Sequence, residues 1–114
     1  MVKVAVIGLG YWGPNLVRNF AAHDGAELRV ACDLKASRRE TIERSYPAVR
    51  TTDDMAPVLA DPAIDAVVIA TPTNTHYPIA KAALEAGKHV WVEKPMADSV
   101  AHAEELVEIG RAHV

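Results

Sequence analysis

A glycine pattern near the N-terminus, Gly8-Leu9-Gly10-Tyr11-Trp12-Gly13, constrains the fold of this chain more than any other feature. It follows an apolar run, residues 2–7, of the kind found in strands buried on both faces of a parallel sheet. Apolar residues at helical spacing follow it from Pro14, a proline that suits the first turn because no N–H is needed there. A G-x-G-x-x-G turn between a strand and a helix predicts parallel strands that alternate with helices.

Apolar runs and helical patterns alternate along the rest of the chain. We expect further strands at residues 28–32, 49–51, 66–70 and 89–92. We expect helices from 14 to about 23, at 36–46, from a cap at Asp53 or Asp54 through 59, at 76–86 with Gly87 closing it, and after Ser99. Thr75 and Ser99 are expected N-caps, and Val100, Ala103, Leu106 and Val107 form the expected inward stripe of the last helix. This alternation predicts an α/β fold, a Rossmann-like doubly wound parallel sheet of about five strands in the order 3-2-1-4-5.

Composition limits the classes of function. The chain has 114 residues, which favours one domain, and 50% of them are hydrophobic, which allows a buried core. The net charge is -3, so there is no overall basic field and we expect neither a nucleic-acid nor a membrane partner. The single cysteine, Cys32, stands in no Cys/His ligand spacing. We therefore expect a cytoplasmic protein without a metal site.

The glycine turn predicts a dinucleotide site when it is combined with one acidic residue. Gly8 permits a tight turn, Gly10 lets the backbone approach a pyrophosphate, and Gly13 lets the helix lie close to the sheet. The free N–H groups of the first helical turn would face the anion. Asp33 ends the second predicted strand, 20 residues after Gly13, where a carboxylate can accept hydrogen bonds from the ribose hydroxyls of an adenosine.

Asp33 also favours NAD over NADP. A carboxylate about 4 Å from a 2′-phosphate would repel it by roughly 4 kcal/mol at an effective dielectric constant near 20. Lys35, Arg38 and Arg39 follow closely and can partly neutralise a phosphate, but a solvated helix face is the simpler interpretation of these residues. A methyltransferase that binds S-adenosylmethionine is the alternative function, because it too uses a glycine-rich turn and an acid after the second strand.

Two further loops are predicted to meet the glycine turn. Residues 71–76, Thr-Pro-Thr-Asn-Thr-His, follow the fourth predicted strand, and Glu93-Lys94-Pro95 follow the fifth. Because the carboxyl ends of parallel strands lie at one edge of the sheet, all three loops converge on one crevice.

These motifs carry a resemblance to a known family. The glycine turn, the T-P-x-x-x-H string of residues 71–76, the stretch A-L-E-A-G-K-H-V at residues 83–90 and the E-K-P string occur in order over about 95 residues. In this the chain resembles the N-terminal nucleotide-binding domain of the glucose-fructose oxidoreductase, inositol dehydrogenase and MocA family. The string of residues 10–15, Gly-Tyr-Trp-Gly-Pro-Asn, resembles members that oxidise a UDP-linked amino sugar at carbon 3.

The resemblance assigns roles to particular residues. It places Lys94 beside the nicotinamide and the substrate, where it would help to polarise or deprotonate the hydroxyl that is oxidised, and it implies a cis bond between Lys94 and Pro95. Glu93 would contact the nicotinamide-side ribose, and the loop 71–74 would pass under the cofactor. His76 has two interpretations of equal weight, a cofactor contact or an ordinary first-turn helix residue. Tyr11 and Trp12 would cover the pyrophosphate or the substrate.

The candidate catalytic residue is therefore Lys94, and the expected cofactor is NAD, with NADP less favoured. The candidate cofactor-binding residues are Gly8, Gly10, Tyr11, Trp12, Gly13, Asp33, Thr71, Pro72, Thr73, Asn74, His76, Glu93, Lys94 and Pro95. His23, His89, His102 and His113 are not expected to be ligands.

The resemblance also bears on activity. Family members carry a second domain that supplies most substrate contacts, and we expect residues 1–114 to form a dinucleotide-binding domain alone, without that domain and without a sixth strand. Such a chain would bind NAD but not oxidise a sugar or nucleotide sugar. The alternative is a non-catalytic, self-associating nucleotide-binding module, because residues 90–92 would form an apolar sheet edge able to pair with a second copy in a homo-oligomer.

Overall fold

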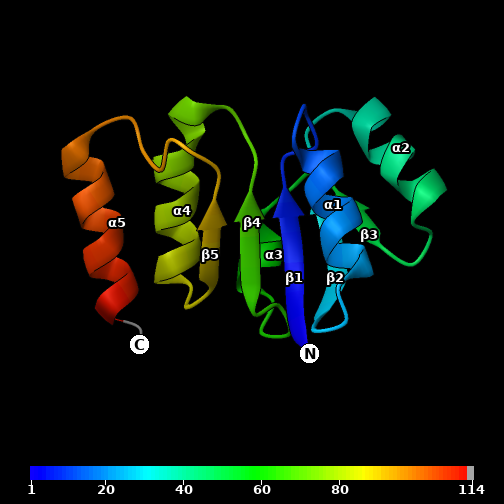
Figure 1. Ribbon diagram of the computed structural model, residues 1–114, viewed down its shortest axis with the longest axis horizontal. Helices are drawn as coiled ribbons and strands as arrows, with labels where there is room; N and C mark the ends of the chain where they lie inside the picture. Colours follow the sequence, from blue (N-terminus) through cyan, green and yellow to red (C-terminus); the bar gives the residue numbers. More distant parts are fainter. Residues whose placement is uncertain (113–114) are drawn as a thin grey trace.

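The computed structural model describes residues 1–112, and its centre is a five-stranded parallel sheet (Figure 1). The strands are β1 (Val2–Ile7), β2 (Ala26–Cys32), β3 (Arg50–Thr52), β4 (Ala66–Ile69) and β5 (His89–Val92). Their order is β3-β2-β1-β4-β5, with every pair of neighbours parallel. The predicted fold class and strand order are confirmed, and β1 lies at the centre because the chain turns back past it after β3.

Helices cover both faces of this sheet. They are α1 (Gly13–Ala22), α2 (Ala36–Ser45), α3 (Ala56–Ala60), α4 (His76–Glu85) and α5 (Val100–Ala112), with a short 3-10 turn, η1 (Thr73–Thr75), before α4. Figure 1 shows α1 and α2 on one face and α3 and α4 on the other, while α5 lies beside α4. This is the arrangement that right-handed crossovers produce when the strand order reverses after β3.

The two faces of the sheet have separate hydrophobic cores. Val4 and Val6 of β1 point toward α1, where they pack with Leu16 and Val17. Ala5 and Ile7 point to the opposite face, which also holds Val58 of α3, Leu106 of α5 and three residues of α4, Ile79, Ala80 and Ala83. Because both faces are covered, the central strands have no polar side, which explains their continuous apolar sequences.

One irregularity interrupts the pairing of β1 with β2. Val4 pairs with Leu28, but the next residue, Ala5, pairs with Val30, so Arg29 is an extra residue in β2. After this bulge Ile7 pairs with Cys32, and the N–H of Gly8 donates to the Cys32 carbonyl at 2.8 Å. The residue after Cys32 therefore lies beside the glycine turn.

Most predicted boundaries are correct to within two residues, but two other predictions about the helices are wrong, the cap of α4 and the inward stripe of α5. Thr75 does not cap α4, because its hydroxyl donates instead to the Pro72 carbonyl within the 3-10 turn. Val100 and Val107 do not face inward, since both are exposed and only Leu106 of the expected stripe is buried. The expected cap at Ser99 is present, where the hydroxyl oxygen accepts from the N–H of His102. His113 lies outside the described residues.

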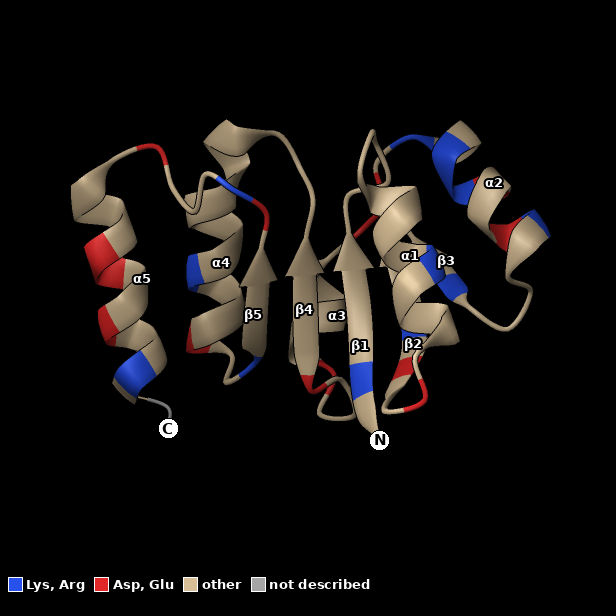
Figure 2. Cartoon of the chain, viewed as in Figure 1, with Lys and Arg blue, Asp and Glu red and all other residues tan. Residues whose placement is uncertain are grey.

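Polar contacts set the position of α5 against α4. Tyr77 donates its hydroxyl hydrogen to Glu105, and Lys81 Nζ lies 2.9 Å from the same carboxylate. The ring of His102 stacks on Tyr77, with the ring centres 3.8 Å apart. Figure 2 shows that α2 and α5 both carry charges of the two signs. Within residues 1–112, every helix is too short or too polar to pass through a membrane.

A buried lysine joins two turns at the amino-terminal edge of the sheet. Lys88 is only 8% exposed, although lysine is rarely buried, and its Nζ donates to the carbonyls of Asp61 and Ile64, at 2.5 and 2.7 Å. Gly87, with a φ of +80°, closes α4 as predicted and turns the chain so that Lys88 points inward. The turn after α3 is thereby attached to the start of β5.

Candidate cofactor site

The glycine turn after β1 packs so closely against neighbouring backbone atoms that two of its glycines leave no room for a side chain. Gly8 has a φ of +100°, and a Cβ at this position would lie 2.7 Å from the carbonyl carbon of Ala70. A Cβ on Gly13 would lie 2.0 Å from the carbonyl oxygen of Gly8. The first turn of α1 is therefore in direct backbone contact with the end of β1, as the glycine spacing predicts.

The middle glycine is open on the side where a phosphate would lie. The nearest atom to a Cβ on Gly10 is a guanidinium nitrogen of Arg38, at 3.5 Å, and no backbone atom lies closer. Within residues 1–112, the N–H groups of residues 10–13 donate to no protein acceptor. Unpaired N–H groups at the start of a helix bind anions, so the turn fits a pyrophosphate.

Asp33 connects the end of β2 to this turn. Its carboxylate accepts hydrogen bonds from the N–H of Leu9 and of Lys35, both at 2.8 Å, and its side chain is only 8% exposed. Burial works against ionisation, but the two N–H groups and the Arg38 guanidinium outweigh it and lower the pKa of Asp33. The ionised carboxylate lies where adenosine ribose hydroxyls would approach.

The arginines after β2 also contact the loop before α2, although Lys35 and Arg38 are exposed, as the interpretation of a solvated helix face predicts. Arg38 lies with Nη1 3.5 Å from the Asp33 carboxylate, and Arg39 donates to the carbonyls of Asp33 and Leu34, at 2.8 and 3.1 Å. Both guanidinium groups therefore turn back toward the loop. These contacts could not be predicted, because helical spacing alone does not show that the preceding loop provides acceptors.

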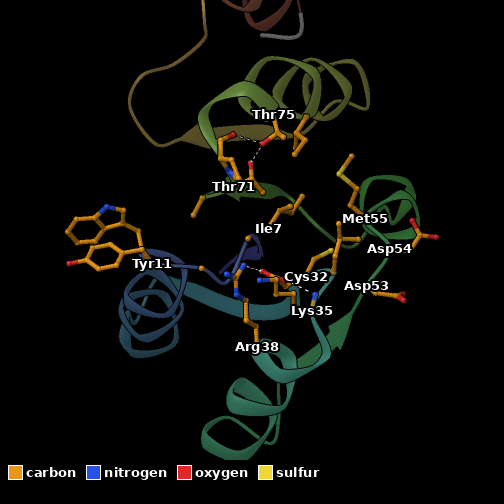
Figure 3. Close-up of a pocket in the computed structure, with 18 residues that line it drawn as sticks. Ile7, Tyr11, Cys32, Lys35, Arg38, Asp53, Asp54, Met55, Thr71 and Thr75 are labelled. Atoms are coloured by element: carbon orange, nitrogen blue, oxygen red, sulfur yellow. Dashed lines mark hydrogen bonds and ion pairs between the residues drawn. The ribbon is translucent and has the colours of Figure 1, made fainter.

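These elements surround a cavity of about 770 Å³ (Figure 3). Figure 3 shows Tyr11 near one end and Asp53, Asp54 and Met55 near the other, with Arg38 and Thr71 on opposite sides. The predicted residues that line it are Gly8, Gly10, Tyr11, Trp12, Asp33, Thr71 and Pro72. Sequence reasoning did not assign Asp53, Asp54, Met55 and Cys32 to the site. Asp53 and Asp54 directly follow the third strand, and this position at the carboxyl edge of the sheet could have predicted that they line the cavity.

The thiol of Cys32 lies in the wall of this cavity and is unreactive there. Burial is the largest cause that raises the pKa of this thiol, and the nearby carboxylate of Asp33 adds to it, so that the pKa reaches about 11. The thiol is therefore protonated at neutral pH and contributes apolar surface. Among the described residues, no three His, Cys, Asp or Glu side chains gather closely enough to hold a metal ion.

The loop after β4 is held by its own threonines and by His76. Thr75 donates its hydroxyl hydrogen to the carbonyl of Pro72 at 2.5 Å, and its oxygen accepts from the hydroxyl of Thr71 at 2.6 Å. His76 is 2% exposed, and its ring lies between the carbonyls of Thr71 and Pro95. A contact of His76 with the cofactor stays a prediction, since His76 does not line the cavity and both ring nitrogens lie against these carbonyls.

The loop after β5 reaches the same edge but not the same cavity. The N–H of Glu93 donates to the Ile69 carbonyl at 3.1 Å, which places the loop beside the end of β4. Lys94 is exposed, the bond to Pro95 is cis as expected, and neither Glu93 nor Lys94 lines the cavity. The cavity thus includes the predicted adenosine and pyrophosphate positions, whereas Lys94 does not line it.

Comparison with known proteins decides what the site binds. A model of an oxidoreductase family with an NAD-binding Rossmann fold, named for Gfo, Idh and MocA, matches residues 2–113. The chain belongs to this family. Its Rossmann domain binds NAD, in agreement with the open glycine turn and the Asp33 carboxylate. The alternative of a methyltransferase is wrong.

Individual relatives agree with this assignment. Over 106 residues the chain is 39% identical to the uncharacterized oxidoreductase YdgJ of Escherichia coli. This match covers 92% of this chain and 30% of YdgJ. It is 38% identical to the NAD(+)-dependent scyllo-inositol 2-dehydrogenase of Bacillus subtilis, over 96% of this chain and 33% of that enzyme. The chain spans about a third of the length of these curated relatives.

A solved structure gives the same fold. GenD2 from gentamicin A biosynthesis, determined in complex with NAD, superposes with a TM-score of 0.93 at 32% identity. The match covers 98% of this chain and 32% of GenD2. The strand order and the glycine turn described above are therefore the NAD-binding architecture of the family.

Proposed function

We propose that this chain is the cofactor-binding part of a dehydrogenase that oxidises a sugar or nucleotide sugar with NAD. The observation that carries the proposal is the meeting of three loops at one sheet edge: the glycine turn closed by Asp33, the Thr71 loop, and the loop that bears Lys94. The similarity to a scyllo-inositol dehydrogenase supports a polyhydroxylated substrate.

Different residues of the chain have different roles in such a reaction. The N–H groups of the glycine turn hold the pyrophosphate, and Asp33 accepts from the adenosine ribose. When bound, NAD⁺ accepts the hydride of the carbinol carbon. The amine of Lys94 takes the hydroxyl proton, so that the carbinol becomes a carbonyl with the loss of a hydride and a proton. Glu93 holds the ribose on the nicotinamide side.

The position of Lys94 can be tested without catalysis. Reductive ¹³C-methylation gives each lysine an NMR signal, and we expect the Lys94 signal to shift when NAD is added. ADP-ribose, which lacks the nicotinamide, should leave that signal unchanged although it fills the same cavity. Lys81, bound to Glu105 between α4 and α5, is the internal control. An equal response of Lys94 to both ligands, or to neither, would contradict its placement.

We also propose that residues 1–114 form one dinucleotide-binding domain that binds NAD, with NADP weaker, and do not oxidise the substrate alone. The support is that the chain spans about a third of the length of its curated relatives. The measurement is NADH formation by the 114-residue chain with inositol, glucose and UDP-N-acetylglucosamine. Turnover of any of these sugars would disprove the claim that the chain alone is inactive.

The exposed aromatic pair at the glycine turn favours a nucleotide sugar as the substrate. Tyr11 and Trp12 are 84% and 56% exposed, and their rings meet edge to face with centres 5.0 Å apart. Aromatic faces at the mouth of a site offer stacking surfaces to a ring. In a Trp91→Phe variant, whose tryptophan fluorescence comes from Trp12 alone, UDP-N-acetylglucosamine added with NAD should quench the emission, whereas inositol should not. Equal quenching by UDP-N-acetylglucosamine and by inositol would contradict the preference for a nucleotide sugar.

A second candidate function, self-association as a nucleotide-binding module, is favoured by the β5 edge. β5 has β4 on one side only, and Trp91 in this strand is 52% exposed beside Phe20. An uncovered apolar edge strand pairs readily with another chain. We expect light scattering to show a dimer or larger species that a Val90→Lys substitution reduces to the monomer. A monomer at high concentration in the unmodified chain would contradict this function.

A further inference from the structure

Arg38 lies against the part of the cavity that the proposed cofactor contacts need. Its Nη1 is 3.5 Å from the Asp33 carboxylate, the group proposed to accept from the adenosine ribose. Three atoms of the same guanidinium are also the atoms nearest to an added Cβ on Gly10, at 3.5, 3.8 and 4.0 Å. Figure 3 shows the side chain reaching from α2 toward the glycine turn. One cation therefore lies beside both the acid and the middle glycine.

The Asp33 carboxylate has little remaining capacity to accept hydrogen bonds. Its Oδ1 accepts from the N–H of Lys35 and its Oδ2 from the N–H of Leu9, both at 2.8 Å. Arg38 approaches the same Oδ2, and the Asp33 side chain is only 8% exposed. A carboxylate offers about four lone-pair positions, so these three contacts leave a single one, on Oδ1. The 2′- and 3′-hydroxyls of a ribose together need two.

The contacts of the two neighbouring arginines differ in strength. Arg39 donates to the carbonyls of Asp33 and Leu34, at 2.8 and 3.1 Å, so the backbone of the loop holds it in place. Within residues 1–112, the Asp33 carboxylate is the one polar group that the Arg38 side chain contacts, and this side chain is 41% exposed. Ion pairs that solvent reaches are weak. Arg38 is therefore the arginine that a ligand can displace.

We propose that Arg38 competes with the 2′-hydroxyl of NAD for the Asp33 carboxylate and is thereby a specificity-determining residue of the cofactor site. When this hydroxyl donates to Oδ2, the guanidinium has to move away from that oxygen. A 2′-phosphate has no hydroxyl hydrogen to donate and is negatively charged, so it would pair with the guanidinium instead. Arg38 thus lowers the affinity for NAD relative to NADP. The competition rests on the proposed function, in which Asp33 accepts from the ribose.

The test compares two ligands that carry the same pyrophosphate, because Arg38 also attracts that group. Nicotinamide 2′-deoxyadenosine dinucleotide, or 2′-deoxy-NAD, lacks only the 2′-hydroxyl, so it leaves the ion pair in place, whereas NAD has to break it. In Arg38→Met we expect calorimetric titration to give a ratio of NAD affinity to 2′-deoxy-NAD affinity about threefold higher than in the unmodified chain, the effect of one partly exposed ion pair. An unchanged or lower ratio would overturn the proposal.

Two further variants show whether the effect depends on the carboxylate. Arg44→Met is the matched control, since Arg44 is an exposed arginine of the same helix that does not line the cavity, and it should leave the ratio unchanged. In an Asp33→Asn background the charge that Arg38 pairs with is absent, so Arg38→Met should no longer raise the ratio. An equal rise with and without the Asp33 charge would contradict a competition for this group.

The displacement can also be read in the unmodified chain, so the proposal stays testable if Arg38→Met does not fold. In a chain labelled with ¹⁵N-arginine, we expect the Nε–H signal of Arg38, identified by its loss in Arg38→Lys, to shift with NAD and much less with 2′-deoxy-NAD. Equal shifts would overturn displacement by the hydroxyl. A chain that binds neither dinucleotide would contradict the proposed function as well, whereas binding of both with an unchanged ratio in Arg38→Met would overturn this inference alone.

Discussion

The carboxylate of Asp33 accepts a hydrogen bond from the backbone N–H of Leu9, 24 residues earlier, at 2.8 Å. The acid predicted to favour NAD is thus also a structural support of the turn predicted to hold the pyrophosphate. One side chain therefore links two parts of the cofactor site, and its substitution should affect ligand selectivity and fold stability together.

Asp33→Asn should weaken NAD binding by about tenfold, since an amide is a poorer acceptor than a carboxylate for ribose hydroxyls and for the loop N–H groups. NADP binding should weaken less, because the repulsion of the 2′-phosphate is removed while Arg38 remains beside it. Calorimetric titration with both nucleotides measures the two affinities. Asp24→Asn, at an exposed position after α1, is the control. An unchanged ratio of the two affinities would contradict the role of Asp33.

Stability should depend on pH through the same carboxylate. The pKa of Asp33 is lower in the folded chain than its ordinary value of 3.8, so the folded state favours the ionised form. The contribution to the free energy of unfolding is complete above the unfolded pKa and is lost as the pH falls through the folded pKa. Urea unfolding from pH 7 to pH 3 should show the gap between the unmodified chain and Asp33→Asn shrinking at low pH. A constant gap would contradict the lowered pKa.

Gly13→Ala should be strongly destabilising because the added carbon would lie 2.0 Å from the Gly8 carbonyl oxygen, a backbone atom that cannot move aside. We expect a loss of about 3 kcal/mol in the free energy of unfolding, measured with urea. Gly110→Ala is the matched control, because the nearest atom to its Cβ is 3.8 Å away and alanine favours the helix by up to about 1 kcal/mol. Equal stability of the two variants would refute the close contact at Gly13.

Lys88→Met should destabilise the chain without changing NAD affinity. Methionine fills a similar volume, but the carbonyls of Asp61 and Ile64 lose their donor in a buried position, at a cost of about 2 kcal/mol. Lys81→Met, which breaks an exposed ion pair with Glu105, should cause a much smaller loss. Thermal unfolding and NAD titration of both variants provide the comparison. A fall in NAD affinity in Lys88→Met would show that the lysine affects the site.

The strand order could be predicted from sequence because its signals are local. Each central strand is a short apolar run, and each is ended by a glycine or a polar loop, so one β-α alternation fits the chain. The handedness of crossovers then leaves few possible sheets. The glycine turn and Asp33 were found by the same route, since their spacing is defined along the chain.

What the sequence did not reveal depends on contacts between distant segments. The stripe of α5 has the right period, but periodicity does not say that α5 packs beside α4 and turns Val100 and Val107 outward. Lys88 was not identified because a charged residue is expected at the surface, and the carbonyls that bind it lie at least 24 positions away. The two carbonyls around His76 likewise come from different loops.

The bulge at Arg29 decides which side chain lies beside the glycine turn. If β1 and β2 paired without an extra residue, Ile7 would lie opposite Ala31, and Cys32 would take the place beside Gly8 that Asp33 now holds. A thiol there would offer no charge to distinguish the two nicotinamide cofactors. The place of Asp33 beside the glycine turn thus depends on one extra residue in β2, four positions before the acid. Deleting Arg29 would remove the bulge but keep Asp33 beside Gly8, because Val30 would follow Leu28 directly and still pair with Ala5.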